Sequence, residues 1–137
     1  TETGQELKRF HVKDGMGMKQ VLAAGIAIAI LSASHSEATL YRARKLGISL
    51  VFIGVEDKLS CLLEICQNLQ ISPAQVAYIG DDLNDIPVLE KVGVPLTVAD
   101  GISAVKKLSC YITVQPGGQG AVREICDLLL GELAHHE

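Results

Sequence analysis

The chain has 137 residues, a net charge of −4 and 48% hydrophobic residues, a size and composition that predict one domain burying about two thirds of its unfolded surface. The negative charge and the few aromatic residues do not suit a nucleic-acid platform, and no apolar run reaches the roughly 18 residues of a membrane span. The four cysteines form no Cys-x-x-Cys pair, which favours buried thiols in a reducing compartment. We therefore expect a cytoplasmic protein without nucleic-acid or membrane partners.

The first elements follow from alternation and from capping residues. Residues 5–12 alternate polar and apolar side chains, which predicts a hairpin strand. A helix is expected over 18–25, with Asp14 at its N-cap and Gly25 just past its last turn. Ser34 and Glu37 have the spacing of a capping box, which predicts the start of a second helix.

From Gly25 onward the chain repeats a helix, a glycine and an apolar strand. Strands are expected over 26–31, 48–53, 76–79, 94–98 and 111–114, and the later helices over 57–70, 103–108 and 121–130. A second capping box, with proline in its first turn, occupies 72–75. Strands that alternate with helices and are apolar throughout indicate an α/β fold with a doubly wound, Rossmann-like parallel sheet.

Three carboxylates follow the apolar run that ends before Gly80. They belong to Asp81, Asp82 and Asp85, and they fall at the C-terminal end of a predicted strand, where open α/β sheets place their ligands. If a helix begins by Asp82, Asp81 and Asp85 share one side of its first turn, and carboxylate oxygens are the ligands that Mg²⁺ prefers. The loop predicts a magnesium site, with helix capping as the alternative.

Two other strand ends carry groups suited to a phosphate. Ser32, Ala33 and Ser34 follow the run 26–31, and their hydroxyl and backbone N–H groups at a helix start are suited to an anion. Lys58 follows the run 48–53 and would neutralise a phosphoryl group. Taken singly, Ser34 is a cap and Lys58 a surface lysine. Together with the acidic loop, however, they are the groups that phosphoryl transfer needs.

The residues Ser32, Lys58 and Gly80-Asp81-xxx-Asp85 resemble the second, third and fourth motifs of the haloacid dehalogenase superfamily of Mg²⁺-dependent aspartyl phosphatases. Residues 10–15, 80–88, 98–100 and 117–128 are similar to the 3-deoxy-D-manno-octulosonate 8-phosphate (KDO 8-phosphate) phosphatase family, and the resemblance runs from about residue 4 to residue 130. It implies a capless phosphatase that acts on phosphorylated keto-sugar acids, assembles as a homotetramer and covers each active site with segments of neighbouring subunits.

The resemblance also implies a role for each matching residue. Asp81 would ligate Mg²⁺ and Asp85 would hold the water shell of the metal, while Ser32 would bond the phosphoryl oxygens and Lys58 would balance charge on the nucleophile and the phosphoryl group. The nucleophile of such enzymes is an aspartate, which forms an aspartyl phosphate that water then cleaves. Residues expected near the substrate or a subunit interface are Asp14, Gly15, Asp82, Gly118, Gln119 and Arg123.

The chain departs from the family at its first motif, an Asp-x-Asp that holds the nucleophile and the general acid and that does not occur among residues 1–137. Because the chain starts at Thr1 rather than Met, we expect the domain to be incomplete at its N-terminus, with the nucleophile upstream, and to be inactive alone. Ser34 and Gln119 stand where the family carries arginine, which removes two cations from the expected anion site.

Two alternatives differ in class from a phosphatase. A similar phosphatase-like domain serves assembly, without catalysis, behind some sialic-acid cytidylyltransferases. A flavodoxin-like signalling receiver has the same fold class but carries its acids at the ends of earlier strands. An Asp-x-Asp strand upstream of Thr1 would identify the phosphatase, and a nucleotidyltransferase there would identify the assembly module.

Overall fold

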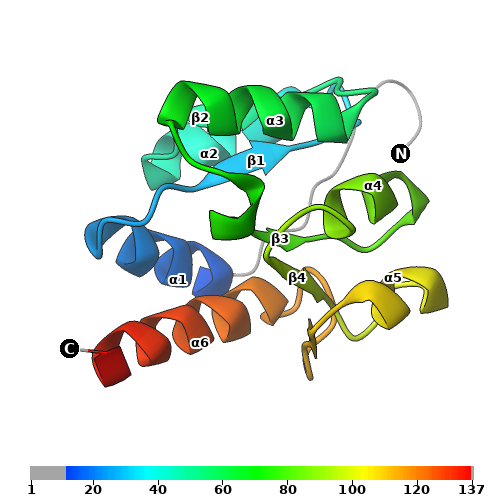
Figure 1. The fold of residues 1–137 in the computed structure, drawn as a ribbon. Coiled ribbons are helices and arrows are strands. Elements are labelled where there is room, and N and C mark those ends of the chain that lie inside the picture. Colours follow the sequence, from blue (N-terminus) through cyan, green and yellow to red (C-terminus); the bar gives the residue numbers. More distant parts are fainter. Residues whose placement is uncertain (1–11, 137) are drawn as a thin grey trace. The chain divides into compact units, whose positions relative to one another are not determined.

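The computed structural model describes residues 12–136, which fall into two compact units (Figure 1). The first unit comprises Thr1–Gly54 and Gly118–Glu137, and the second comprises Val55–Gly117. The chain therefore passes between the units twice, after Gly54 and after Gly117. The expectation of a single domain stays a prediction. Among the described residues, no helix combines the length and the apolar character that crossing a membrane requires.

The described part of the first unit contains a parallel pair of strands and three helices. β1 pairs with β2 in register from Ala29 opposite Leu50 to Leu31 opposite Phe52. A core of Ala43, Leu46 and Ile48 packs against apolar side chains from the neighbouring helix and strands. The elements are α1 (Val12–Ala23), β1 (Ala29–Leu31), α2 (Glu37–Leu46), β2 (Leu50–Phe52) and α6 (Ala121–His136).

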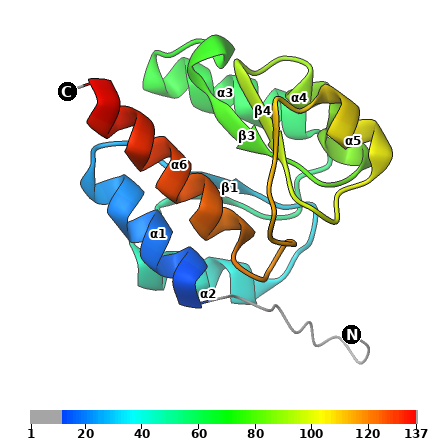
Figure 2. The same cartoon turned by 90° about the horizontal axis from the view of Figure 1, so that it is seen from below.

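The helices α1 and α6 lie side by side, as two views show (Figures 1 and 2). Gly17 permits this close approach, because a Cβ atom there would lie 3.0 Å from the Cβ of Cys126 and 2.9 Å from the Cδ of Arg123. Asp14 adds a polar contact, since its Oδ1 accepts a hydrogen bond of 2.9 Å from the Arg123 N–H in the first turn of α6. Asp14 therefore caps a helix other than its own.

The second unit contains a three-stranded parallel sheet in the order β3-β4-β5. Its buried side chains include Val88, Leu89, Leu96 and Val105. Gly93 directly precedes β4, and a Cβ atom on it would lie 2.0 Å from the carbonyl oxygen of Ala74, so the close approach of these two segments requires glycine at position 93. The elements are α3 (Lys58–Leu69), η1 (Pro73–Gln75), β3 (Ala77–Ile79), η2 (Leu83–Asp85), α4 (Ile86–Leu89), β4 (Val94–Thr97), α5 (Ser103–Leu108) and β5 (Tyr111–Ile112).

The predicted fold class is confirmed, because every strand pair within residues 12–136 is parallel and the strands alternate with helices. The predicted helix ends agree best with the structure where a capping residue marks them. Asp57 caps α3 through the Ser60 N–H, Gln70 ends it in the left-handed conformation, and the capping box at 72–75 is present. The strands are shorter than the apolar runs, because a strand extends only as far as its hydrogen-bonded neighbour.

Several predicted boundaries are wrong. The helix expected over 18–25 begins at Val12, so Asp14 lies inside its first turn and is not its N-cap. The helix expected from Ser34 begins at Glu37 with Ser36 as N-cap, because Gly54 and Ser36 hydrogen-bond to Ser34 and hold it in the loop. The last helix continues beyond residue 130 to His136. The expected hairpin strand lies outside the described residues except for residue 12, which is helical.

Candidate active site

The carboxylate of Asp85 is the centre of a hydrogen-bond network in the second unit. Its Oδ1 accepts from the Lys58 ammonium at 2.9 Å and from the Tyr78 hydroxyl at 2.5 Å. Its Oδ2 accepts from the backbone N–H of Asp81 at 2.9 Å and of Asp82 at 3.2 Å. These four donors match the approximately four acceptor positions of a carboxylate. Asp85 thus fixes the acidic loop, residues 80–85, from inside.

Burial and hydrogen bonding act in opposite directions on this carboxylate. Asp85 is only 2% exposed, and burial alone would raise its pKa. The hydrogen bonds from Tyr78 and Lys58, and then that from the Asp81 N–H, outweigh the burial and hold the pKa below its usual value. Burial and the bond to Asp85 raise the pKa of Tyr78, which therefore stays a hydrogen-bond donor. Asp85 is consequently an anion that its neighbours stabilise.

Gly80 is needed for this arrangement of the acidic loop. A Cβ atom on Gly80 would lie 2.5 Å from the Cβ of Asp85 and 2.8 Å from its Cγ. The Gly80 carbonyl oxygen accepts a 2.6 Å hydrogen bond from the hydroxyl of Thr97, which is fully buried on β4. The end of β3 is therefore held from the Asp85 side and from the neighbouring strand.

Asp81 differs from Asp85 in its exposure and in the hydrogen bonding of its carboxylate. It is exposed, and its carboxylate makes no hydrogen bond within residues 12–136. Partial desolvation, together with the negative charges of Asp85 and Asp82, raises its pKa, while Lys58 opposes that rise. An exposed carboxylate surrounded mainly by other negative charge favours a bound cation.

Asp82 has the capping role that short polar residues often have. It is the N-cap of η2, and its Oδ1 accepts a 2.7 Å hydrogen bond from the Leu83 N–H. The helical start at Asp82 was expected, but Asp81 and Asp85 do not present two free carboxylates on one side of it. Asp85 points inward to its four donors, and Asp81 stays exposed.

Lys58 is the first residue of α3, and its side chain contacts the carboxylate of Asp85. Its side chain is 11% exposed and that of Asp85 is 3% exposed, so the ion pair is nearly buried. The start of α3 is fixed by Asp57, whose carboxylate accepts from the Ser60 N–H and hydroxyl. One N–H of the ammonium binds Asp85, and the other two make no hydrogen bond within the described part of the chain. Lys58 can therefore donate to a further anion.

Ser32, Ala33 and Ser34 lie in the first unit, in the loop between β1 and α2. The Ser34 N–H donates to the Ser32 Oγ at 3.1 Å, and the Ser34 carbonyl accepts from the Gly54 N–H at 2.8 Å. The Ala33 N–H makes no hydrogen bond among the residues described. The structure thus brings Lys58, Asp81, Asp82 and Asp85 together, while the predicted phosphate loop belongs to the other unit.

Of the residues expected near the substrate or an interface, some are buried between helices and others lie at the surface. Asp14 is buried, and a Cβ atom on Gly15 would lie 3.1 Å from side-chain atoms of both Arg42 and Leu46, so these positions serve helix packing. Arg123 donates to Asp127 on the same helix. Gly118 adopts a positive φ of 75° in an exposed turn, and Gln119 is exposed beside it.

Asp100, at the C-terminal end of β4, was not assigned a role from the sequence. Its Oδ1 accepts a 2.8 Å hydrogen bond from the Gly117 N–H, and its charge contributes to the raised pKa of Asp81. Tyr78 was also missed, although a hydroxyl in an otherwise apolar buried strand signals a hydrogen-bond partner. Both residues extend the site beyond the predicted motifs.

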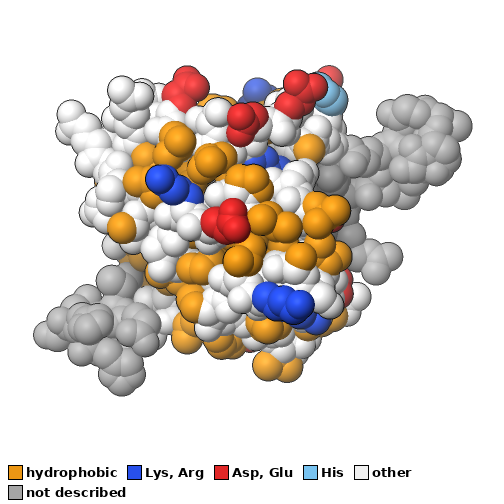
Figure 3. Space-filling view, turned by 45° about the vertical axis from the view of Figure 1, so that its right-hand side comes forward, with side chains coloured by type: hydrophobic (Ala, Val, Ile, Leu, Met, Phe, Trp, Pro, Cys, Tyr) orange, Lys and Arg blue, Asp and Glu red, His pale blue; other side chains and the backbone are white. Residues whose placement is uncertain are grey.

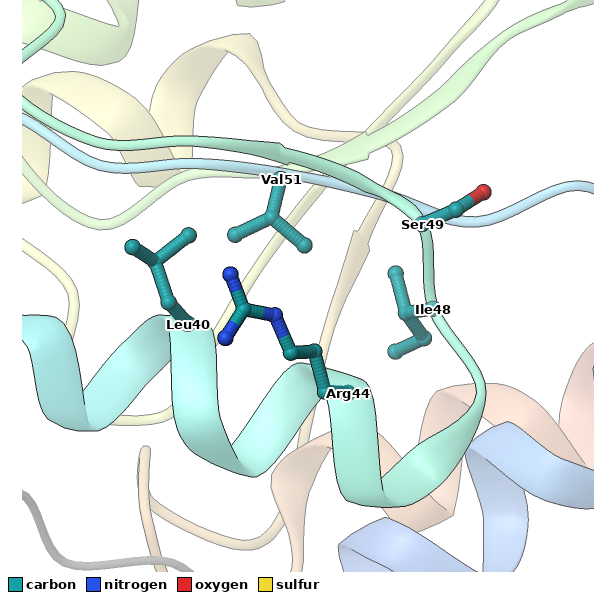
Figure 4. A pocket seen from close by; sticks show the side chains of 5 residues that line it. All are labelled: Leu40, Arg44, Ile48, Ser49 and Val51. Carbon is teal, nitrogen blue, oxygen red and sulfur yellow. The ribbon is translucent and has the colours of Figure 1, made fainter.

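A pocket of about 460 Å³ lies elsewhere in the first unit, between α2 and β2. Figure 4 shows the guanidinium of Arg44 extending from α2 toward Val51 and Leu40. The remaining lining residues are Ile48 and Ser49. None of the predicted site residues lines this pocket, and the residues described include no group of three His, Cys, Asp or Glu side chains able to hold a metal ion.

Hydrophobic side chains also reach the surface among scattered charged groups (Figure 3). The most exposed are Val114 at 78%, Leu83 at 64% and Tyr41 at 63%. Leu83 belongs to the acidic loop, and Val114 lies two residues before the start of the glycine-rich segment 116–120. Two exposed apolar side chains therefore accompany the predicted functional segments of the second unit.

Comparisons with known proteins identify the relatives of the chain. Residues 29–125 match the family model of haloacid dehalogenase-like hydrolases. The 3-deoxy-D-manno-octulosonate 8-phosphate phosphatase KdsC of Yersinia pestis is 43% identical over 127 residues, which are 93% of this chain and 68% of that protein. A solved structure of the Yersinia pestis phosphatase has a TM-score of 0.90 at 42% identity and covers 95% of this chain and 70% of its own.

A second solved structure adds information about ligands. The 3-deoxy-D-manno-octulosonate 8-phosphate phosphatase of Moraxella catarrhalis was solved in complex with magnesium, phosphate and KDO. It has a TM-score of 0.91 at 39% identity and covers 96% of this chain and 75% of its own. These proteins are longer than the part that the chain matches.

Proposed function

Because the chain belongs to the haloacid dehalogenase-like hydrolases and its relatives are KDO 8-phosphate phosphatases, we propose that it is the larger part of a Mg²⁺-dependent phosphatase for a keto-sugar-acid phosphate. The observation that carries this proposal is the acidic loop with Lys58. It combines the exposed carboxylate of Asp81 with the nearly buried ammonium of Lys58, and neither that carboxylate nor two of the ammonium N–H groups has a hydrogen-bond partner in the described chain. Asp85 binds the Lys58 ammonium and the Asp81 backbone N–H.

Asp81 is the residue that would hold the magnesium ion. Its exposed carboxylate has oxygen ligands to offer, and a cation would relieve the repulsion from Asp82 and Asp85 that raises its pKa. Bound magnesium would stabilise negative charge on the phosphoryl oxygens. The role of Asp85 in holding the water shell of the metal stays a prediction. In the structure its carboxylate accepts hydrogen bonds from Lys58, Tyr78 and two backbone N–H groups, and so holds the loop that carries Asp81.

Lys58 in the second unit and the loop 32–34 in the first unit are each expected to bind phosphoryl oxygens. The two remaining N–H groups of Lys58 supply positive charge, and the Ser32 hydroxyl and the Ala33 N–H supply hydrogen-bond donors. Ser34 and Gln119 carry no charge, so we expect anion binding to depend mainly on Lys58. Substrate affinity should accordingly be sensitive to the charge at position 58.

The nucleophile of the proposed reaction is an aspartate that residues 1–137 do not supply in an Asp-x-Asp motif. We place it in a segment upstream of Thr1. An oxygen–phosphorus bond forms to that aspartate as the ester bond breaks, the leaving sugar oxygen takes a proton, and water then cleaves the aspartyl phosphate. Two observations support a further strand: the chain matches only 68% of its Yersinia pestis relative, and the strands described form two separate sheets.

We also propose a homotetramer in which the segment 116–120 covers the active site of a neighbouring subunit. The exposed side chains of Leu83 and Val114 beside the functional segments support such a contact, since burying them would be favourable. Gln119 and Arg123 would lie near that interface. Deleting the segment together with α6 is not a clean test, because α6 buries Ala121, Ile125 and Cys126.

The experiment that tests the proposed function compares two proteins. One is the 137-residue chain, and the other is the same chain extended by the sequence encoded upstream of Thr1. Both are incubated with Mg²⁺ and a panel of sugar phosphates that includes KDO 8-phosphate, and phosphate release is measured. We expect release by the extended protein only, with keto-sugar-acid phosphates preferred. Equal release by both proteins would refute the upstream nucleophile, and no release by either would refute the phosphatase.

A further inference from the structure

The hydroxyl of Tyr78 and the ammonium of Lys58 bind the same carboxylate, that of Asp85. Tyr78 extends from β3 and donates to the same oxygen of Asp85, Oδ1, that accepts from Lys58. At 2.5 Å this is the shortest of the four hydrogen bonds that Asp85 accepts. A short O–H···O⁻ distance is typical of a charge-assisted bond, which is about twice as strong as a neutral one.

The occupied acceptor positions of Asp85 fix the position at which Lys58 can bind. Oδ2 is occupied by two backbone N–H groups, and Oδ1 is shared between the Tyr78 hydroxyl and one ammonium N–H. A carboxylate oxygen offers about two acceptor positions. Lys58 is therefore held by one hydrogen bond, and two of its N–H groups are directed elsewhere.

We propose that Tyr78 is a positioning residue, which occupies one acceptor position on Asp85 Oδ1, so that Lys58 binds at the other position and directs its two remaining N–H groups to the phosphoryl group. This inference rests on the proposed function of Lys58. Without the hydroxyl, an acceptor position on a 2% exposed carboxylate would be left open. The Lys58 ammonium would then share its one hydrogen bond between the two acceptor positions of Oδ1, because an unpaired buried acceptor is costly. Its other two N–H groups would point in a different direction.

The Tyr78→Phe variant removes this one hydroxyl and keeps the ring that fills the strand's packing. The matched control is Tyr41→Phe, because Tyr41 is 63% exposed and its contact with Lys45 needs only the ring. Both variants are made in the extended protein. Mg²⁺ affinity measured by calorimetry checks that the acidic loop is intact, and it should be unchanged in both.

Two readouts then decide the proposal. The first is the ¹⁵N signal of the Lys58 ammonium in NMR spectra, which reports its hydrogen bonding whether or not the protein is active. The second is the separation of kcat from KM with KDO 8-phosphate as substrate. Charge on the phosphoryl oxygens changes most in the transition state, so we expect Tyr78→Phe to lower kcat about tenfold with little change in KM. Tyr41→Phe should match the wild type in both readouts.

Each other outcome overturns the proposal. An unmoved Lys58 signal in Tyr78→Phe would show that the hydroxyl does not position the ammonium. A moved signal with unchanged kcat would show that this position has no catalytic consequence. If the wild-type protein releases no phosphate from any substrate, the proposed function fails by that result alone, and the NMR comparison still decides whether Tyr78 orients Lys58.

Discussion

Asp81 and Asp85 have opposite surroundings although only three residues separate them. Asp85 is buried and accepts four hydrogen bonds, whereas Asp81 is exposed and its carboxylate accepts none within residues 12–136. A change at Asp81 should therefore alter ligand binding, and a change at Asp85 should alter stability.

The first prediction concerns Mg²⁺ binding. Asp81→Asn in the extended protein should weaken Mg²⁺ binding at least about tenfold, because it removes the negative charge that a hard cation prefers. The control is Asp82→Asn, since asparagine keeps the N-cap of η2 and changes the net charge equally. Calorimetric titration measures both affinities. Equal affinities in the two variants would remove Asp81 as the metal ligand.

The second prediction compares a buried ion pair with an exposed one. Asp85→Asn leaves the nearly buried Lys58 ammonium without a counter-charge, and it should lower the free energy of unfolding by about 3–5 kcal/mol. Asp127→Asn breaks the pair with Arg123, whose side chains are 26% and 56% exposed, and should cost less than about 1 kcal/mol. Urea unfolding followed by circular dichroism measures both. Similar losses would show that Asp85 is not the anchor of the loop.

Among the helices and turns, two glycines have contrasting environments. Gly93 packs against the carbonyl of Ala74 in the turn before β3, whereas Gly131 lies in α6 with no atom near a Cβ position. Gly93→Ala should lower the free energy of unfolding by about 1–3 kcal/mol, the usual range for an overpacked site. Gly131→Ala should raise it by about 0.5–1 kcal/mol, because alanine favours the helix. Thermal and urea unfolding test both signs, and a tolerated Gly93→Ala would contradict the close approach.

Helices were predicted better than strands for a physical reason. The ends of α3 depend on Asp57 and Gln70, which act within one turn of the helix, so the local sequence contains the information. The extent of β1 depends on β2, about twenty residues away, and an apolar run does not specify where that pairing stops. Ser34 illustrates a further limit, because a partner at Gly54 holds it outside the helix that its spacing with Glu37 predicted.

The candidate site was predictable in its residue types and not in its connections. The sequence pattern identified Lys58, Asp81 and Asp85 as one group, and the structure brings them together. It did not reveal that Asp85 faces inward, because that depends on Lys58, 27 positions away, and on the hydroxyl of Tyr78. Which carboxylate is available to a ligand is therefore a property of the folded chain.

For the molecule as a whole, the fourth prediction concerns assembly. Light scattering of the extended protein should report four chains, and Val114→Asp should reduce that number, because a charge would be buried at the proposed contact beside the segment 116–120. Tyr41→Asp is the control, since Tyr41 is also exposed but belongs to α2. A monomeric wild-type protein with full activity would rule out a lid supplied by a neighbour.

The most direct test of the central claim is the release of phosphate from KDO 8-phosphate by the extended protein, measured with Mg²⁺ and with EDTA. We expect release that requires the metal, is lost in Asp81→Asn and persists in Asp82→Asn. Loss of an interaction made chiefly in the transition state should lower kcat/KM by about a hundredfold or more. Equal activity of Asp81→Asn and wild type, or release that EDTA does not affect, would contradict the account.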